Sequence, residues 1–180
     1  MNFRYSVQAT IVALGIGATF LAPVYAQSTA SGTSASVSAS DQQFVQDASV
    51  AGATEIEAGK LALKNSSDPA VKKFAERMIN EHKKLAHGLD MVAEKKGIKG
   101  PATPDAAVLG KLQNLKGADF DKVYVSTVAI DGHEKAVALF QKESDSGSDP
   151  QLKALAGKAL PTIKHHLTMA QQLPGAKSSS

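Results

Sequence analysis

The sequence predicts an all-α protein: a four-helix bundle of two helical hairpins joined by a long crossover that contains a short helix. Three observations lead to this fold class. Apolar residues recur at alternating steps of three and four in four long segments, as on helices that pack in a bundle. The second helix of each hairpin has the same start signal, Asp68-Pro69 in one and Asp149-Pro150 in the other. The segment between the hairpins, 97–118, is much longer than a simple turn requires.

The first hairpin is predicted over residues 40–64 and 68–96. Ser40 and Gln43 match a capping box, in which each side chain satisfies a free backbone N–H of the first helical turn. The second helix begins with an aspartate as N-cap and a proline at the first helical position, where no backbone N–H is needed. Gly97 ends it, as glycine commonly does at a helix C-terminus.

The second hairpin is predicted over residues 119–143 and 150–173, after a connection with a short helix at about 104–115. Roughly twelve helical residues at 1.5 Å and ten extended residues at about 3.3 Å reach on the order of 50 Å. That length exceeds a bundle of about 40 Å. We therefore expect a crossover that inverts the second hairpin relative to the first.

Each apolar stripe contains one conspicuous ionisable residue. The stripe of the third long helix, for example, is predicted to consist of Phe120, Val123, Ser126, Ile130, His133, Val137 and Phe140. Burial of such a group without a partner costs several kcal/mol or shifts its pKa toward the neutral form. One interruption in each of four helices calls for a joint explanation. The four residues are Glu55, His82, His133 and His166.

The spacing of these four residues places them near one level of the bundle. Glu55 and His82 lie thirteen and fourteen residues from Asp68. His133 and His166 lie sixteen and seventeen residues from the equivalent aspartate of the second hairpin. If the crossover inverts that hairpin, all four share a level near the middle. If both hairpins run the same way, the two pairs differ by about 4.5 Å of helix rise.

Two hypotheses account for the cluster. Three imidazoles and one carboxylate suit a single Zn, Cu, Ni or Fe ion, so the four residues are candidate metal ligands. The alternative is a hydrogen-bonded network that fixes helix register without binding a ligand. Five further ionisable residues nearby are expected mainly at the surface: Glu57, His87, Asp131, Glu134 and His165. Of these, Glu134 is one step from His133 and is a candidate to support it.

The two ends of the chain are expected to lie outside the bundle. Residues 1–26 have the pattern of a secretory signal peptide, with Arg4 before an apolar run and a small-x-small site that predicts cleavage after Ala26. The apolar run is shorter than the roughly 20 residues that span a bilayer. Residues 27–40 form a disordered Ser/Ala-rich tether and 174–180 a flexible tail, which leaves 41–173 as the bundle domain.

Composition excludes several classes of function. The chain has no cysteine, which removes disulfides, thiolate ligands and a cysteine nucleophile. The net charge is only +3, without the basic stripe and interleaved aromatics of a nucleic-acid binder. No nucleophile elbow, phosphate loop or zincin motif appears. We expect a non-catalytic envelope or stress-related protein, periplasmic or secreted, without a membrane span after cleavage. If the protein has a partner, we expect another protein of the cell envelope.

Several motifs together resemble a known family. They are Glu55-Ile56-x-x-Gly59, Met78-Ile79-x-x-His82, and Leu160-Pro161 followed by His166-Leu167. The combination, over about 41–173, resembles the exported bacterial family called domain of unknown function 4142. The resemblance implies a ferritin-like four-helix bundle and an exported location. Many ferritin-like relatives bind two metal ions with Glu-x-x-His motifs on two helices. Here Ile79 and Ile163 stand in place of those glutamates, so the resemblance does not extend to di-iron chemistry.

Overall fold

The computed structural model describes residues 37–98 and 103–176, and within them it contains seven helical segments and no strand. In chain order the segments are α1 Ala39–Asn65, α2 Pro69–Lys95, α3 Ala106–Gly110, α4 Gly117–Val123, the π-helix η1 Tyr124–Ile130, α5 Asp131–Ser146 and α6 Pro150–Ala170. The predicted signal peptide, most of the tether and the last four residues lie outside the described residues. None of the described helices is both long enough and apolar enough to cross a membrane.

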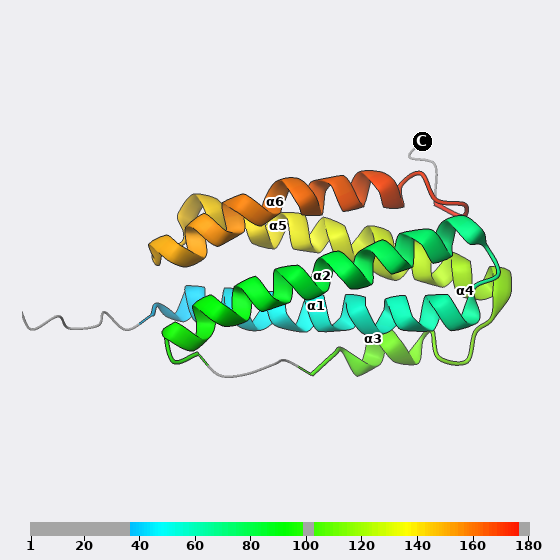
Figure 1. Cartoon of the computed structure of the whole chain (residues 1–180), viewed down its shortest axis with the longest axis horizontal. Helices are drawn as coiled ribbons and strands as arrows, with labels where there is room; N and C mark the ends of the chain where they lie inside the picture. The colour runs from blue at the N-terminus through cyan, green and yellow to red at the C-terminus, as the bar shows by residue number, and fades with distance from the viewer. Residues whose placement is uncertain (1–36, 99–102, 177–180) are drawn as a thin grey trace, which may run out of the picture. The chain divides into compact units, whose positions relative to one another are not determined.

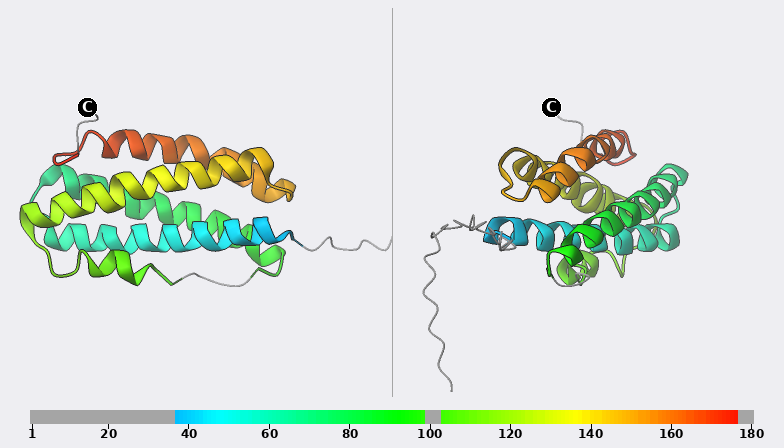
Figure 2. Two further views of the ribbon diagram at one scale, coloured as in Figure 1. Left: turned by 180° about the vertical axis from the view of Figure 1, so that it is seen from behind. Right: turned by 60° about the vertical axis from the view of Figure 1, so that its left-hand side comes forward.

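The connection between the hairpins is a crossover, as predicted. In Figure 1, α1 and α2 run in opposite directions, the connection with α3 returns beside α1, and α5 runs in the same direction as α2. Figure 2 shows the same arrangement from behind. Lys116, just before α4, donates to the Asn65 side chain at the end of α1. At the other end, Asp41 accepts from the backbone N–H groups of Ser148 and Asp149, at 3.0 and 2.9 Å. The segments α4, η1 and α5 follow one another without a break and make up the third long helix, between α2 and α6 in the chain. The four long helices therefore form a ferritin-like bundle with an inverted second hairpin.

The helix starts follow the local capping rules, with one correction. Asp68 and Asp149 cap α2 and α6 in the same way, with φ and ψ of −83° and 123° in one and −82° and 120° in the other. Each aspartate accepts from two backbone N–H groups of the following turn. The predicted start of α1 at Ser40 is wrong by two residues. The N-cap is Ser38, whose side chain accepts from the N–H of Asp41 at 3.1 Å.

The predicted inward stripe of the third long helix is correct at Phe120 but wrong between Phe120 and His133. Val123, Ser126 and Ile130 are only half-buried, whereas the residues that face the core are Tyr124, Val125, Val128 and Ala129. The reason is the π-helix η1, in which the N–H of Asp131 bonds to the carbonyl of Ser126, five residues earlier. A π-turn holds more residues than an α-turn, so it shifts the phase of the helix before His133.

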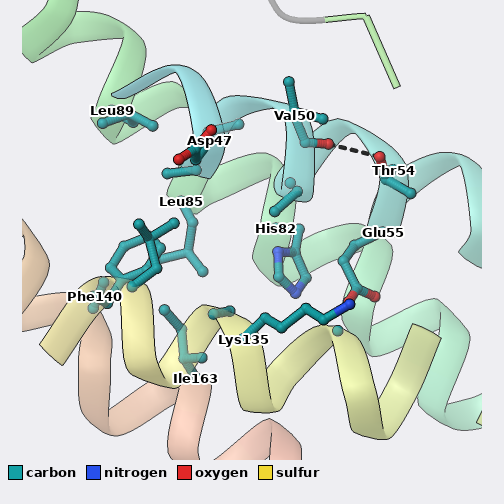
Figure 3. Close-up of a pocket in the computed structure, with 18 of the residues that line it drawn as sticks. Asp47, Val50, Thr54, Glu55, His82, Leu85, Leu89, Lys135, Phe140 and Ile163 are labelled. Carbon is teal, nitrogen blue, oxygen red and sulfur yellow. Dashed lines mark hydrogen bonds between the residues drawn. The ribbon is translucent and has the colours of Figure 1, made fainter. Parts of the chain in front are cut away.

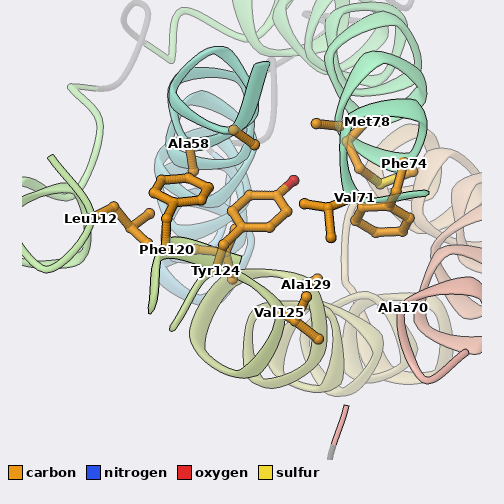
Figure 4. Packing of buried hydrophobic residues seen from close by; sticks show 13 residues of the cluster. Ala58, Val71, Phe74, Met78, Leu112, Phe120, Tyr124, Val125, Ala129 and Ala170 are labelled. Atoms are coloured by element: carbon orange, nitrogen blue, oxygen red, sulfur yellow. The ribbon is translucent and has the colours of Figure 1, made fainter. Parts of the chain in front are cut away.

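The buried apolar side chains form two clusters, and the predicted polar residues lie between them along the bundle axis. One cluster includes Ala58, Met78, Phe120 and Tyr124, and Figure 4 shows its packing. The other is built by residues near the opposite ends of the helices, among them Phe44, Leu89, Phe140, Leu152 and Ile163. On every long helix the polar residue falls in the gap between the two clusters. The bundle core is thus apolar at both ends with a polar layer in between.

Candidate metal site

Each of the four long helices contributes one residue to this polar layer. Glu55 of α1 and His82 of α2 are each 6% exposed, and His133 of α5 and His166 of α6 are completely buried. The crossover brings the two pairs to one level, which is the arrangement that the sequence spacing predicted for an inverted second hairpin.

The three imidazole rings form a nearly equilateral triangle. Ring centroids are 5.5 Å apart for His82 and His133, and 5.4 Å apart for the two pairs that include His166. One nitrogen from each ring lies within 4.8 Å of the others. The Nε2 atoms of His82 and His133 are 3.4 Å apart. Two nitrogens bound to one ion at 2.0–2.1 Å would be about 3.3–3.6 Å apart, depending on the angle between them.

Glu55 occupies a different place from the three histidines. Its Oε1 lies 3.4 Å from Nδ1 of His133, without the alignment of a hydrogen bond. Nδ1 is the ring nitrogen of His133 other than the one that faces His82. The group of mutually close donor atoms contains the three histidines and not Glu55. The carboxyl group therefore stands behind one imidazole of the triangle.

A second carboxylate, which the sequence analysis did not single out, also contacts a histidine. Oε2 of Glu81 lies 2.5 Å from Nε2 of His166, across the interface between α2 and α6. The Glu81 side chain is 32% exposed. It is next to His82 in the sequence and therefore one step off the apolar stripe, so the periodicity gave no signal for it. A long side chain at the edge of a stripe can still reach across a helix interface.

Burial keeps the three imidazoles neutral. It lowers the pKa of His82 well below the ordinary value, and repulsion from His133 and His166 acts in the same direction. Burial and repulsion from His166 lower the pKa of His133 to about 4, although backbone carbonyls of the preceding turn oppose the change. For His166, burial lowers the pKa, and the contact with Glu81 opposes it. Neutral imidazole is the form that binds a metal ion.

Burial also changes the acid and phenol groups of the layer. It raises the pKa of Glu55 from 4.5 to about 8, so the metal-free protein holds this carboxyl protonated at neutral pH. Burial raises the pKa of Tyr124 well above its ordinary value, and the proximity of Glu55 adds to this increase. Both groups are uncharged at pH 7, which agrees with the position of Glu55 between the two apolar clusters and of Tyr124 within one of them.

Part of the hydrogen-bonding capacity of the layer is unused. Within the described part of the chain, Oε2 of Glu55 and Nδ1 of His166 are buried and have no hydrogen-bond partner. Buried polar groups in proteins are nearly always paired. A network whose only purpose is to fix helix register should satisfy its members. The free ring nitrogen of the buried His166 instead fits a site that accepts a cation.

A cavity of about 1370 Å³ reaches the layer from one side. Its walls come mainly from α1, α2, α5 and α6, and they include Glu55, Glu81 and His82 but neither His133 nor His166. Figure 3 shows Glu55 and His82 among the side chains that line it. The three histidines are thus buried between the helices, and the side of the layer with His82 and the two carboxyl groups faces the cavity.

The remaining ionisable residues named in the sequence analysis lie at or near the surface. Glu57 pairs with Lys60 at 2.5 Å, and its side chain is 41% exposed. The other four are exposed: His87, Asp131, Glu134 and His165. Because Glu134 is exposed, it does not support His133 as the sequence analysis considered.

The fold and the polar layer define a class: an all-helical bundle of two crossed-over hairpins with a Glu/His cluster at mid-height. The chain belongs to the family described as domain of unknown function (DUF4142), whose model matches residues 26–173. No curated protein matches the chain.

Solved structures with the same fold include proteins of two groups. The copper(I)-bound form of CopM is 19% identical with a TM-score of 0.63, over 73% of this chain and 93% of that one. A DUF305 fragment from Deinococcus radiodurans is 17% identical with a TM-score of 0.65, over 76% and 95%. A DUF305 protein from Streptomyces coelicolor, described as secreted, is 14% identical with a TM-score of 0.63, over 74% and 89%. At such identities the likeness shows the fold alone.

Proposed function

We propose that this protein is an exported, non-catalytic protein that binds one transition-metal ion in its core. His82, His133 and His166 are the ligands, and Glu55, the fourth predicted member, stands beside His133. The observation that carries the proposal is the triangle of three buried, neutral imidazoles from three helices. Nδ1 of His166 is buried in the same layer without a partner, and a bound cation would supply one.

Copper is the first choice among the ions. Imidazole ligands suit Zn, Cu, Ni and Fe, and Cu(II) has the highest affinity of the divalent first-row ions for a given site. Structural relatives support this order, because CopM structures contain Cu(I), Cu(II) or Ag. Export is supported by the signal-peptide pattern of residues 1–26 and by the secreted DUF305 relative.

A structural role for the layer is the second candidate. It is favoured by the Glu81–His166 contact of 2.5 Å and by the 3.4 Å approach of His82 to His133, since both are distances at which a network could form. The unpaired buried atoms in the same layer, Oε2 of Glu55 and Nδ1 of His166, weigh against it. We therefore place metal binding first and the register-fixing network second.

Metal analysis of the purified protein tests the proposal. The protein is stripped with a chelator, dialysed against Cu(II) or Zn(II), and assayed for ion per chain. We expect one ion in the wild type and none in His133→Leu. His165→Leu is the matched control, because this exposed histidine neighbours His166 without belonging to the triangle. A wild type that retains no more ion than His133→Leu would leave the register-fixing network as the function of the layer.

A further inference from the structure

Glu81 connects the two hairpins at the level of the histidines. It lies on α2 beside His82, yet its carboxylate meets Nε2 of His166 on α6 at 2.5 Å. The histidine is completely buried, whereas Glu81 is partly exposed and lines the cavity. On its other side, Arg77 approaches Oε1 of Glu81 at 4.0 Å.

The contact with Glu81 fixes the tautomer of His166. A carboxylate oxygen accepts hydrogen bonds, so the ring nitrogen that lies 2.5 Å from it, Nε2, is the one that carries the proton. In the other tautomer two lone pairs would face each other at 2.5 Å, and Nδ1–H would be a buried donor without an acceptor. With the proton on Nε2, the unpaired atom is instead a lone pair on Nδ1. That lone pair needs no donor if a cation binds there.

We propose that Glu81 is the positioning residue of the metal site: it holds the proton on Nε2 of His166 so that Nδ1 is the coordinating nitrogen. This inference rests on the proposed function. Metal-binding histidines in proteins almost always donate their other ring N–H to a carboxylate, carbonyl or water, which fixes the orientation of the ring. Nδ1 of His166 then joins Nε2 of His82 and Nε2 of His133, the pair that is already 3.4 Å apart.

The short contact at His166 contrasts with the looser one at His133. Glu55 lies 3.4 Å from Nδ1 of His133 and is not aligned for a hydrogen bond, so it does not fix that ring in the same way. Of the two carboxyl groups, Glu81 is the one that reaches from the first hairpin to the last helix, α6. Its removal should therefore release His166 rather than the whole triangle.

Two measurements on the same variants test this role. The variants are Glu81→Ala, Glu81→Gln and the control Glu76→Gln, an exposed carboxylate on the same helix. Nitrogen-15 NMR of the metal-free protein near neutral pH reports the tautomer of His166. We expect the Nε2–H form in the wild type and the control, and loss of this single tautomer in Glu81→Ala. Competition titration with Cu(II) should show affinity about 10–100-fold lower in Glu81→Ala and unchanged in the control.

Glu81→Gln should fall between the two, because its amide oxygen still accepts from Nε2–H, and it carries the test if Glu81→Ala does not fold. An Nδ1–H tautomer in the wild type would overturn the inference even if the protein binds copper. Unchanged copper affinity in both Glu81 variants would also overturn it. A wild type with the Nε2–H tautomer but no copper binding would overturn the proposed function instead and reduce the Glu81 contact to a structural hydrogen bond.

Discussion

Replacement of Glu55 by glutamine should make the metal-free protein more stable, and increasingly so as the pH rises. Burial raises the pKa of this carboxyl from 4.5 to about 8. The folded state therefore keeps a proton that the unfolded chain has already lost between these values. When the folded state binds more protons, stability falls as the pH rises through that window. Glutamine has nearly the same shape and no proton to lose, so the variant escapes this penalty.

The size of the effect follows from the pKa values. One pKa unit corresponds to about 1.36 kcal/mol, so the penalty is roughly 3 kcal/mol at pH 7 and roughly 5 kcal/mol above pH 8. Near pH 4.5 it is close to zero. The glutamine amide adds an N–H that needs an acceptor, which costs about 1–3 kcal/mol when unsatisfied but does not depend on pH. The diagnostic quantity is therefore the change with pH in the difference between Glu55→Gln and the wild type.

Urea unfolding of the chelator-treated protein, followed by circular dichroism, measures this difference. The slope of the free energy of unfolding against urea should be unchanged, so that the midpoints report stability. Glu57→Gln is the control, because the Glu57 side chain is 41% exposed and its ion pair with Lys60 is at the surface, where such pairs contribute little. If the difference between Glu55→Gln and the wild type stays constant from acid to alkaline pH, Glu55 is not held neutral by burial and the reasoning is wrong.

Three further predictions follow from the site, the packing and the N-terminal segment. His82→Leu should abolish bound ion and the thermal stabilisation by added copper, while chelator-treated His82→Leu should unfold at the wild-type temperature or above it. Gly59→Ala should destabilise by about 1–3 kcal/mol because its Cβ would lie 2.8 Å from Cγ1 of Ile79; Gly88→Ala, whose Cβ meets nothing within 4 Å, should instead stabilise by up to about 1 kcal/mol in the same urea titration. N-terminal sequencing of protein from the cell envelope should begin at Gln27, and a start at the first methionine would contradict the predicted cleavage.

Much of the fold could be predicted because it depends on local rules. The Asp-Pro starts of α2 and α6 are complete within two residues, and both capping aspartates make the expected backbone contacts. The length of the connection favoured a crossover, since it can span the bundle and a simple turn would need far fewer residues. Once the second hairpin is inverted, the level shared by Glu55 and the three histidines follows from counting residues.

The π-helix and the role of Glu81 could not be predicted in the same way. No local residue signal specifies the bond from the N–H of Asp131 to the carbonyl of Ser126, which occurs in the segment that buries Tyr124 and Val125. Glu81 sits one step off its apolar stripe, where the period predicts a surface residue. Only the position of α6 across the interface gives its carboxylate a buried partner.

The two hairpins contribute different groups to the polar layer. Both carboxyl groups belong to the first hairpin, and each stands behind a histidine of the second: Glu55 behind His133 and Glu81 behind His166. His82 is the one imidazole that the first hairpin supplies. Neither hairpin alone therefore holds more than two of the three nitrogen donors, and neither can both present and orient its own imidazoles. Because an ion bound by all three histidines joins α2 to α5 and α6, metal binding must stabilise the docking of the hairpins.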